Sequence, residues 1–174
     1  VYKDLYFGTE PPFLPLGMPR NRLFYVNSFS KMLSITGWRV GYLIAEKSLM
    51  KDIRAIHDYT GLCAPSILQY AISEYLEKND YGSSYLEINR NKLAFNYRFM
   101  TKELKRLGFS VENSGGGYFV WCKLPMNNGN GVEFSLDLYD QEKVGVVPGI
   151  HFSSEADYWI RINIAREHNE LVEA

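Results

Sequence analysis

The residues with the clearest chemical potential lie close together in the first quarter of the chain: Ser28, Ser30, Lys31 and Arg39. Arginine presents a planar fork of N–H donors, and two hydroxyls near it complete a set of groups suited to an anion such as phosphate. A lysine amine next to a cationic group loses its proton more readily, and the neutral amine is a usable nucleophile. The spacing therefore predicts a phosphate site with a reactive lysine beside it.

This combination fits a lysine that forms a Schiff base with pyridoxal 5'-phosphate. Two apolar, strand-like runs flank the stretch, at residues 23–26 and 40–45. A lysine on the connection between two strands is held at the mouth of a sheet, where α/β folds place their ligands. The alternative is a surface turn that happens to contain these residue types, but several of them at fixed spacing favour the cofactor site.

The same residues resemble a known family. The motif Ser-x-Ser-Lys, followed five residues after the lysine by Thr-Gly-Trp-Arg-x-Gly, is similar to the cofactor-lysine signature of the class I/II aminotransferases, which are fold-type I pyridoxal-phosphate enzymes. The resemblance implies that Lys31 holds the cofactor and shuttles the proton between Cα and C4′. It implies that Arg39 binds the cofactor phosphate, with help from Ser28 and Ser30.

The resemblance extends to the first residues, Val1-Tyr2-Lys3-Asp4-Leu5, which are similar to the end of the family's Asp-x-x-Tyr element. By this resemblance the Tyr2 hydroxyl bonds the phenolic oxygen of the cofactor. The family's aspartate, which pairs with the pyridine nitrogen, would fall before residue 1. Because the chain starts at Val1 and the family is more than twice as long, we expect a fragment that is inactive alone.

A second candidate site lies near the end of the sequence, in the run from Tyr158 to Ala165. Side chains alternate between the two faces of a strand, so Ile160, Ile162 and Ile164 share one face and Arg161 points to the other. The run resembles the family's strand that carries the arginine for the substrate α-carboxylate. The resemblance therefore implies that Arg161 is the substrate-binding residue, in keeping with the strength of guanidinium–carboxylate pairs.

Hydrophobic periodicity predicts the elements that surround these residues. Gly108 stands where the C-cap of the longest helix is expected. In chain order, helices are expected over residues 47–59, from Pro65, over 84–107, over 133–140 and from about 166, and strands over 109–111, 118–122, 144–147 and 158–165.

Composition excludes several classes of function. Hydrophobic residues make up 46% of the 174 residues and the formal net charge is −1, so the chain has no basic surface typical of nucleic-acid binding. No apolar run approaches the length of a membrane span. Cys63 and Cys122 lack the spacing of a metal or redox site and favour a reducing cytoplasm. The three histidines are scattered, so no metal site is expected.

Taken together, these observations predict an α/β fold in which residues 1–88 are the C-terminal part of a large cofactor-binding domain. Residues 89–174 would form a small α+β domain. The predicted activity is transfer of an amino group between an amino acid and a 2-oxo acid, in a cytoplasmic enzyme that the resemblance implies is a homodimer.

Two other functions are compatible with the same residues. One is a pyridoxal-phosphate-dependent C–S lyase or cyclopropane-carboxylate synthase of the same fold, although the Thr-Gly-Trp-Arg sequence favours transamination. The other is a non-catalytic binding module built from an aminotransferase-like domain, which would lack the cofactor absorbance band.

Overall fold

The computed structural model describes residues 1–8, 17–19, 21, 23–125 and 129–174 of the chain. The chain divides into two compact units. The N-terminal unit is Val1–Asn89 and the C-terminal unit is Arg90–Ala174. Lys31 therefore belongs to the first unit and Arg161 to the second.

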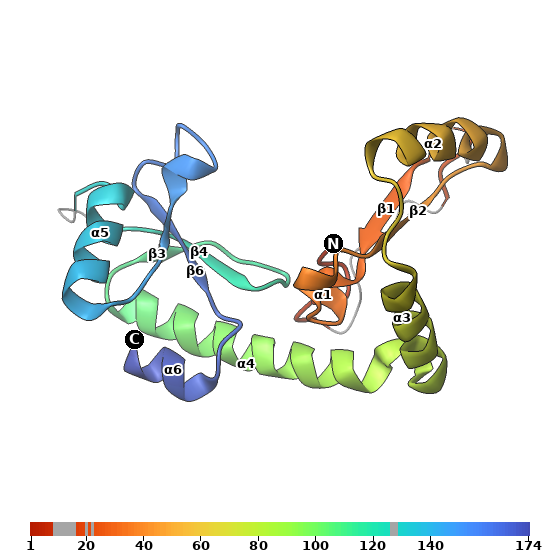
Figure 1. Cartoon of the computed structure of the whole chain (residues 1–174). Helices are drawn as coiled ribbons and strands as arrows, with labels where there is room; N and C mark the ends of the chain where they lie inside the picture. The colour runs from red at the N-terminus through yellow and green to blue at the C-terminus, as the bar shows by residue number, and fades with distance from the viewer. Residues whose placement is uncertain (9–16, 20, 22, 126–128) are drawn as a thin grey trace. The chain divides into compact units, whose positions relative to one another are not determined.

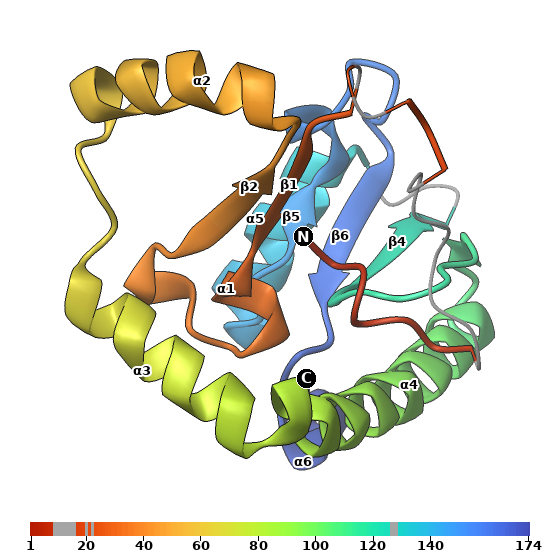
Figure 2. The same ribbon diagram turned by 90° about the vertical axis from the view of Figure 1, so that its right-hand side faces the viewer.

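The N-terminal unit is built around a two-stranded antiparallel sheet (Figure 2). Its strands pair from Tyr25 opposite Ile44 to Ser28 opposite Gly41. The connection between them is not a simple turn but holds two short helices. The Ser28 side chain caps the first of these helices. In order, the elements are β1 (Tyr25–Ser28), α1 (Phe29–Met32), η2 (Thr36–Trp38) and β2 (Gly41–Ile44).

Two longer helices follow in this unit, α2 (Lys47–Thr60) and α3 (Ser66–Lys78). Both were expected from their apolar periodicity, and Pro65, expected to begin the second one, is its N-cap residue. A short η3 helix (Asp80–Gly82) then leads into α4 (Ser83–Arg106), which passes from the first unit into the second. Among the helices of the described ranges, none has both the length and the apolar composition needed to cross a membrane.

The C-terminal unit contains a four-stranded antiparallel sheet with the order β3-β4-β6-β5. The expected strand over 144–147 is displaced, because the paired residues are Val147 and Pro148. After α4, the elements are β3 (Ser110–Val111), β4 (Phe119–Lys123), α5 (Gly131–Glu142), β5 (Val147–Pro148), η4 (Gly149–His151), β6 (Trp159–Asn163) and α6 (His168–Glu173).

One face of this sheet forms the core of the unit. Val120, Cys122, Ile160 and Ile164 are almost completely buried there, as the alternation of each strand predicts. Buried Asn96 of α4 donates 3.0 Å hydrogen bonds to the carbonyls of Ile164 and Arg166, which ties the end of β6 to the helix. Figure 1 shows α6 alongside the same part of α4, where the His168 ring packs edge-on against two phenylalanines, Phe95 and Phe99.

The two cysteines of the chain should differ sharply in reactivity. Cys63 is exposed, whereas Cys122 is buried and burial raises the pKa of its thiol to about 12. Because the thiolate is the reactive form, we expect iodoacetamide at about pH 8, near the ordinary thiol pKa, to modify Cys63 alone in the folded chain and both thiols after unfolding. Mass spectrometry of the two samples measures this directly, and modification of Cys122 in the folded chain would contradict the packing of β4.

Candidate functional site

The first part of the candidate site is the start of α1. The Ser28 hydroxyl accepts a hydrogen bond from the Ser30 backbone N–H at 3.1 Å, which caps the helix. It also lies 2.8 Å from the Ser30 hydroxyl, and Ser30 is buried. The two hydroxyls predicted to hold a phosphate are therefore neighbours, and Lys31 follows them in the same helical turn.

The residues after α1 are folded back against it. The Thr36 hydroxyl donates to the Ser30 carbonyl at 3.3 Å, and the Phe29 backbone N–H donates to the Val40 carbonyl at 3.2 Å. These bonds join the two halves of the sequence motif, Ser-x-Ser-Lys and Thr-Gly-Trp-Arg-x-Gly. No role of Thr36 was expected from the sequence, in which its place in the motif is the one signal of importance.

Arg39 has an unusual backbone conformation. Its φ of 56° and ψ of 37° lie in the left-handed region, and its Nη1 donates to the Thr36 carbonyl at 3.1 Å. A non-glycine residue in a sparsely populated backbone region costs about 1–3 kcal/mol, and such residues concentrate at functional sites. The strained turn directs an exposed guanidinium that pairs with no carboxylate of the described residues, so it is available to an anion.

Gly41 explains why the motif ends on glycine. A Cβ atom at this position would lie 2.7 Å from the Asn27 carbonyl oxygen, which no ordinary side chain tolerates. Gly41 pairs with Ser28 at the start of β2. A larger residue would therefore push β2 away from β1, the strand that ends at Ser28.

Tyr2 lies in the same unit, at the exposed start of the chain. Its backbone carbonyl accepts a 3.0 Å hydrogen bond from the Leu5 N–H. The next residues, Lys3 and Asp4, form an ion pair. Burial raises the pKa of Tyr25 in β1, and the nearby Tyr42 raises it further.

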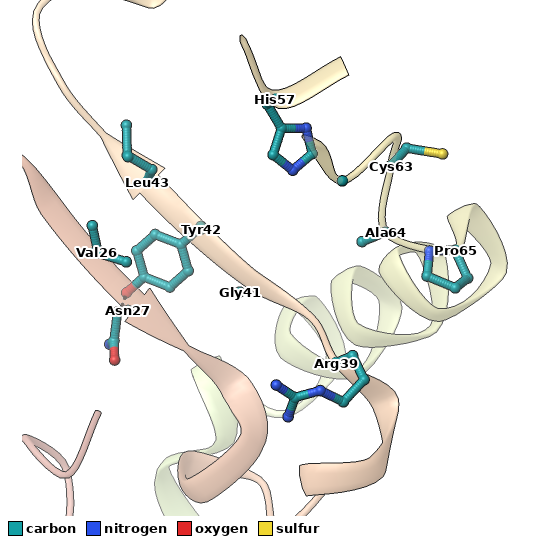
Figure 3. Close-up of a pocket in the computed structure, with 11 residues that line it drawn as sticks. Val26, Asn27, Arg39, Gly41, Tyr42, Leu43, His57, Cys63, Ala64 and Pro65 are labelled. Carbon is teal, nitrogen blue, oxygen red and sulfur yellow. Dashed lines mark hydrogen bonds between the residues drawn. The ribbon is translucent and has the colours of Figure 1, made fainter. Parts of the chain in front are cut away.

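A pocket of about 470 Å³ opens beside Arg39 (Figure 3). Its walls come from β1 and β2, from the end of α2 at His57 and from the segment of Cys63, Ala64 and Pro65 that precedes α3. Lys31 and the two serines are not among its lining residues. Of the residues predicted to bind the cofactor, Arg39 lines this cavity, and the cavity is separate from Lys31.

Arg161 lies in β6 of the C-terminal unit, on the sheet face opposite buried Ile160 and Ile164. Its guanidinium carbon is 4.1 Å from the ring centre of Phe119 and 4.5 Å from that of Phe152. Its Nε atom is buried without a hydrogen-bond partner. Among the described residues no carboxylate pairs with Arg161, which leaves a positive charge suited to an external anion.

The donors of the N-terminal unit can be compared with the groups of pyridoxal phosphate. An amine suits its aldehyde, two adjacent hydroxyls and an uncompensated guanidinium suit its phosphate, and a phenol suits its phenolic oxygen. Lys31, Ser28, Ser30, Arg39 and Tyr2 provide this set within one unit. The residues present therefore fit the cofactor in the chemistry of their donors, and their individual roles remain predictions.

The family model for aminotransferase class I and II matches residues 1–174. The putative aminotransferase YugH of Bacillus subtilis is 29% identical over 175 residues, which cover 100% of this chain and 45% of that protein. An aspartate aminotransferase of Thermotoga maritima is 30% identical over 176 residues, or 100% of this chain and 44% of that protein. The chain thus spans somewhat less than half the length of these relatives.

Solved structures of aminotransferases also match the fold of this chain. An aromatic aminotransferase from Pyrococcus horikoshii matches 99% of this chain and 47% of its own, with a TM-score of 0.90 and 22% identity. The aspartate aminotransferase of Thermotoga maritima matches 99% of this chain and 44% of its own, with a TM-score of 0.84 and 29% identity. The expected mixture of helix and sheet, matching part of a longer fold, is confirmed.

Proposed function

The chain belongs to the class I and II aminotransferases, and from this premise we propose that the whole protein transfers an amino group between an amino acid and a 2-oxo acid with pyridoxal 5'-phosphate. The resemblance inferred from the Ser-x-Ser-Lys motif is thereby confirmed at the level of the family. Because the chain spans about 45% of the length of its relatives, the activity is proposed for the whole protein. The observation that carries the proposal is the position of Lys31 in α1, directly after the Ser28–Ser30 hydroxyl pair.

Lys31 is proposed to do the covalent and proton-transfer work. Its amine would hold the cofactor and, as a free amine, would take the proton from the substrate Cα as a general base. The protonated amine would then deliver that proton to C4′ as the general acid. Bound pyridoxal phosphate supplies the electron sink for the bond that breaks at Cα, and the chain supplies position and electrostatics.

The remaining residues are proposed to bind and orient. Ser28, Ser30 and Arg39 hold the phosphate through charge-assisted hydrogen bonds, which are the stronger class of such bonds. The Tyr2 phenol bonds the phenolic oxygen of the cofactor. Arg161 binds the substrate α-carboxylate and so fixes the orientation of the reacting Cα.

We also propose that the protein is a cytoplasmic homodimer. Cys63 and Cys122 form no disulfide, which agrees with a reducing compartment. Large apolar side chains of the N-terminal unit are exposed along the end of α2 and the start of α3, and such surfaces are typical of protein contacts. The exposed apolar side chains of this region include Tyr59, Leu62, Ile67 and Tyr70.

An activity assay in which the protein receives one amino acid together with one 2-oxo acid tests the proposal. The whole protein with added cofactor should form a new amino acid only when an acceptor 2-oxo acid is present. Release of 2-oxo acid at the same rate without an acceptor would indicate a lyase instead. Lack of a cofactor absorbance band in the protein would indicate a non-catalytic module.

Residues 1–174 assayed alone are expected to show no turnover, even with added cofactor. The sheet of the N-terminal unit has two strands in the described part of the chain, and a two-stranded sheet is at best marginally stable in water. Its open edges also favour association with other chains. We therefore expect weak cofactor binding and self-association in size-exclusion chromatography. Transaminase turnover by residues 1–174 would contradict this expectation.

A further inference from the structure

The guanidinium of Arg161 is held between two aromatic rings that come from different parts of the C-terminal unit. Phe119 lies in β4, and Phe152 directly follows η4. Their ring centres are 4.1 Å and 4.5 Å from the guanidinium carbon. Both distances are well within the range in which a cation is attracted to the face of an aromatic ring.

Further aromatic residues support this arrangement. Trp121 lies opposite Arg161 in the β4–β6 register and contacts Phe152 edge-on, with ring centres 5.7 Å apart. It also stacks on Trp159, with ring centres 5.6 Å apart and an interplanar angle of 9°. Phe152 thus contacts Trp121 as well as Arg161, which restricts where its ring can move.

The backbone before Phe152 is fixed as well. A Cβ atom at Gly149 would lie 2.3 Å from the Ala156 carbonyl oxygen and 2.8 Å from the Trp159 Cβ, so glycine allows η4 to approach the sheet. The Phe152 N–H then donates to the Gly149 carbonyl at 2.8 Å. The close approach at Gly149 therefore determines where Phe152 meets Arg161.

The rings leave the guanidinium restricted but uncompensated. They neutralise no charge, and among the described residues no carboxylate pairs with Arg161. Aromatic contacts limit the rotation of the guanidinium, while its N–H donors lie in the guanidinium plane. A planar donor edge held in one orientation suits bidentate contact with a carboxylate.

We propose that Phe119 and Phe152 are positioning residues, which hold the Arg161 guanidinium in the orientation that receives the substrate carboxylate. This inference rests on the proposed role of Arg161 in substrate binding. Neither phenylalanine was singled out by the sequence, because Phe119 is one aromatic residue of an apolar strand and Phe152 lies in a connection outside any periodic pattern.

The test is a double-mutant cycle in the whole protein with added cofactor. Phe152→Leu should raise the KM for the amino acid roughly two- to thirtyfold, the range of cation–π contributions, with a smaller effect on kcat. Phe119→Leu should act in the same direction. Phe152→Tyr keeps an aromatic face and should restore a KM near the original value. In an Arg161→Ala background, Phe152→Leu should cause no further rise in KM.

A second measurement does not depend on activity. In a nitrogen-15 NMR spectrum, the Arg161 Nε–Hε signal should carry the ring-current shift of two nearby rings. Phe152→Leu should move this signal toward the position of an ordinary arginine, whereas Phe152→Tyr should leave it almost unchanged. Unchanged signals in both variants would overturn the inference, and circular dichroism confirms that each variant is folded.

The outcomes separate the inference from the function on which it rests. If Arg161→Ala raises KM and Phe152→Leu does not, the positioning role is wrong and the carboxylate role of Arg161 stands. If Arg161→Ala leaves KM unchanged, both are wrong. An equal rise in KM from Phe152→Leu with and without Arg161 would show that the phenylalanine acts on packing alone.

Discussion

Replacing Lys31 with alanine is expected to abolish transamination by the whole protein. A positioned general acid–base group typically contributes 10²–10⁴-fold to a rate, by order of magnitude, and Lys31 is also proposed to hold the cofactor. Some cofactor should still bind, because the Ser28 and Ser30 hydroxyls stay in place through the N-cap of α1. Steady-state kinetics and a cofactor titration of the same sample measure the two effects.

The matched controls for this experiment are Lys47→Ala and Lys51→Ala. Both lysines are exposed on α2, in the same unit as Lys31. Surface substitutions usually change free energies by less than about 0.5 kcal/mol, so turnover should stay within about twofold of the original. Substantial turnover by the Lys31→Ala protein would rule out this lysine as the acid–base group.

Replacing Arg161 with alanine should weaken substrate binding much more than cofactor binding. A hydrogen bond to a charged group is worth about 1.5–3 kcal/mol, so the loss should be roughly ten- to a hundredfold or more. The residues proposed to hold the cofactor all lie in the N-terminal unit, and Arg161 lies in the other. The KM for the amino acid and the dissociation constant of the cofactor, measured on one preparation, check this prediction.

Arg166→Ala provides the comparison for this variant. Arg166 is exposed shortly after β6, and it is its backbone carbonyl, not its side chain, that accepts from Asn96. Its removal should therefore alter surface charge without altering the substrate site. A substrate KM that is unchanged by Arg161→Ala, or raised equally by Arg166→Ala, would remove Arg161 from the proposed site.

The longer elements could be predicted from the sequence because their apolar residues repeat over several turns. Helix α2 was expected over 47–59 and occupies Lys47–Thr60, and α4 was expected over 84–107 and occupies Ser83–Arg106. The glycine expected to end α4, Gly108, has a φ of +88°, which is typical of a helix C-cap. Short elements were less predictable, since α1 has one turn and β5 has two paired residues.

The candidate site could be predicted only in part. The spacing of the motif identified Ser28, Lys31 and Arg39 as chemical groups, but not the left-handed backbone of Arg39, which depends on how the turn closes on Thr36. Strand alternation gave the face on which Arg161 lies. Alternation could not predict the contact between Arg161 and the Phe152 ring, because that contact depends on a loop whose path is set by packing at Gly149.

The most direct test of the central proposal is to identify the residue that carries the cofactor. Borohydride reduction of the cofactor-loaded whole protein fixes the cofactor to the amine that holds it, and peptide mapping by mass spectrometry then finds the modified residue. We predict a single modification at Lys31, in the peptide that contains the Ser-x-Ser-Lys motif. Modification of another lysine, such as Lys47 or Lys51 of α2, with Lys31 unmodified, would contradict the account.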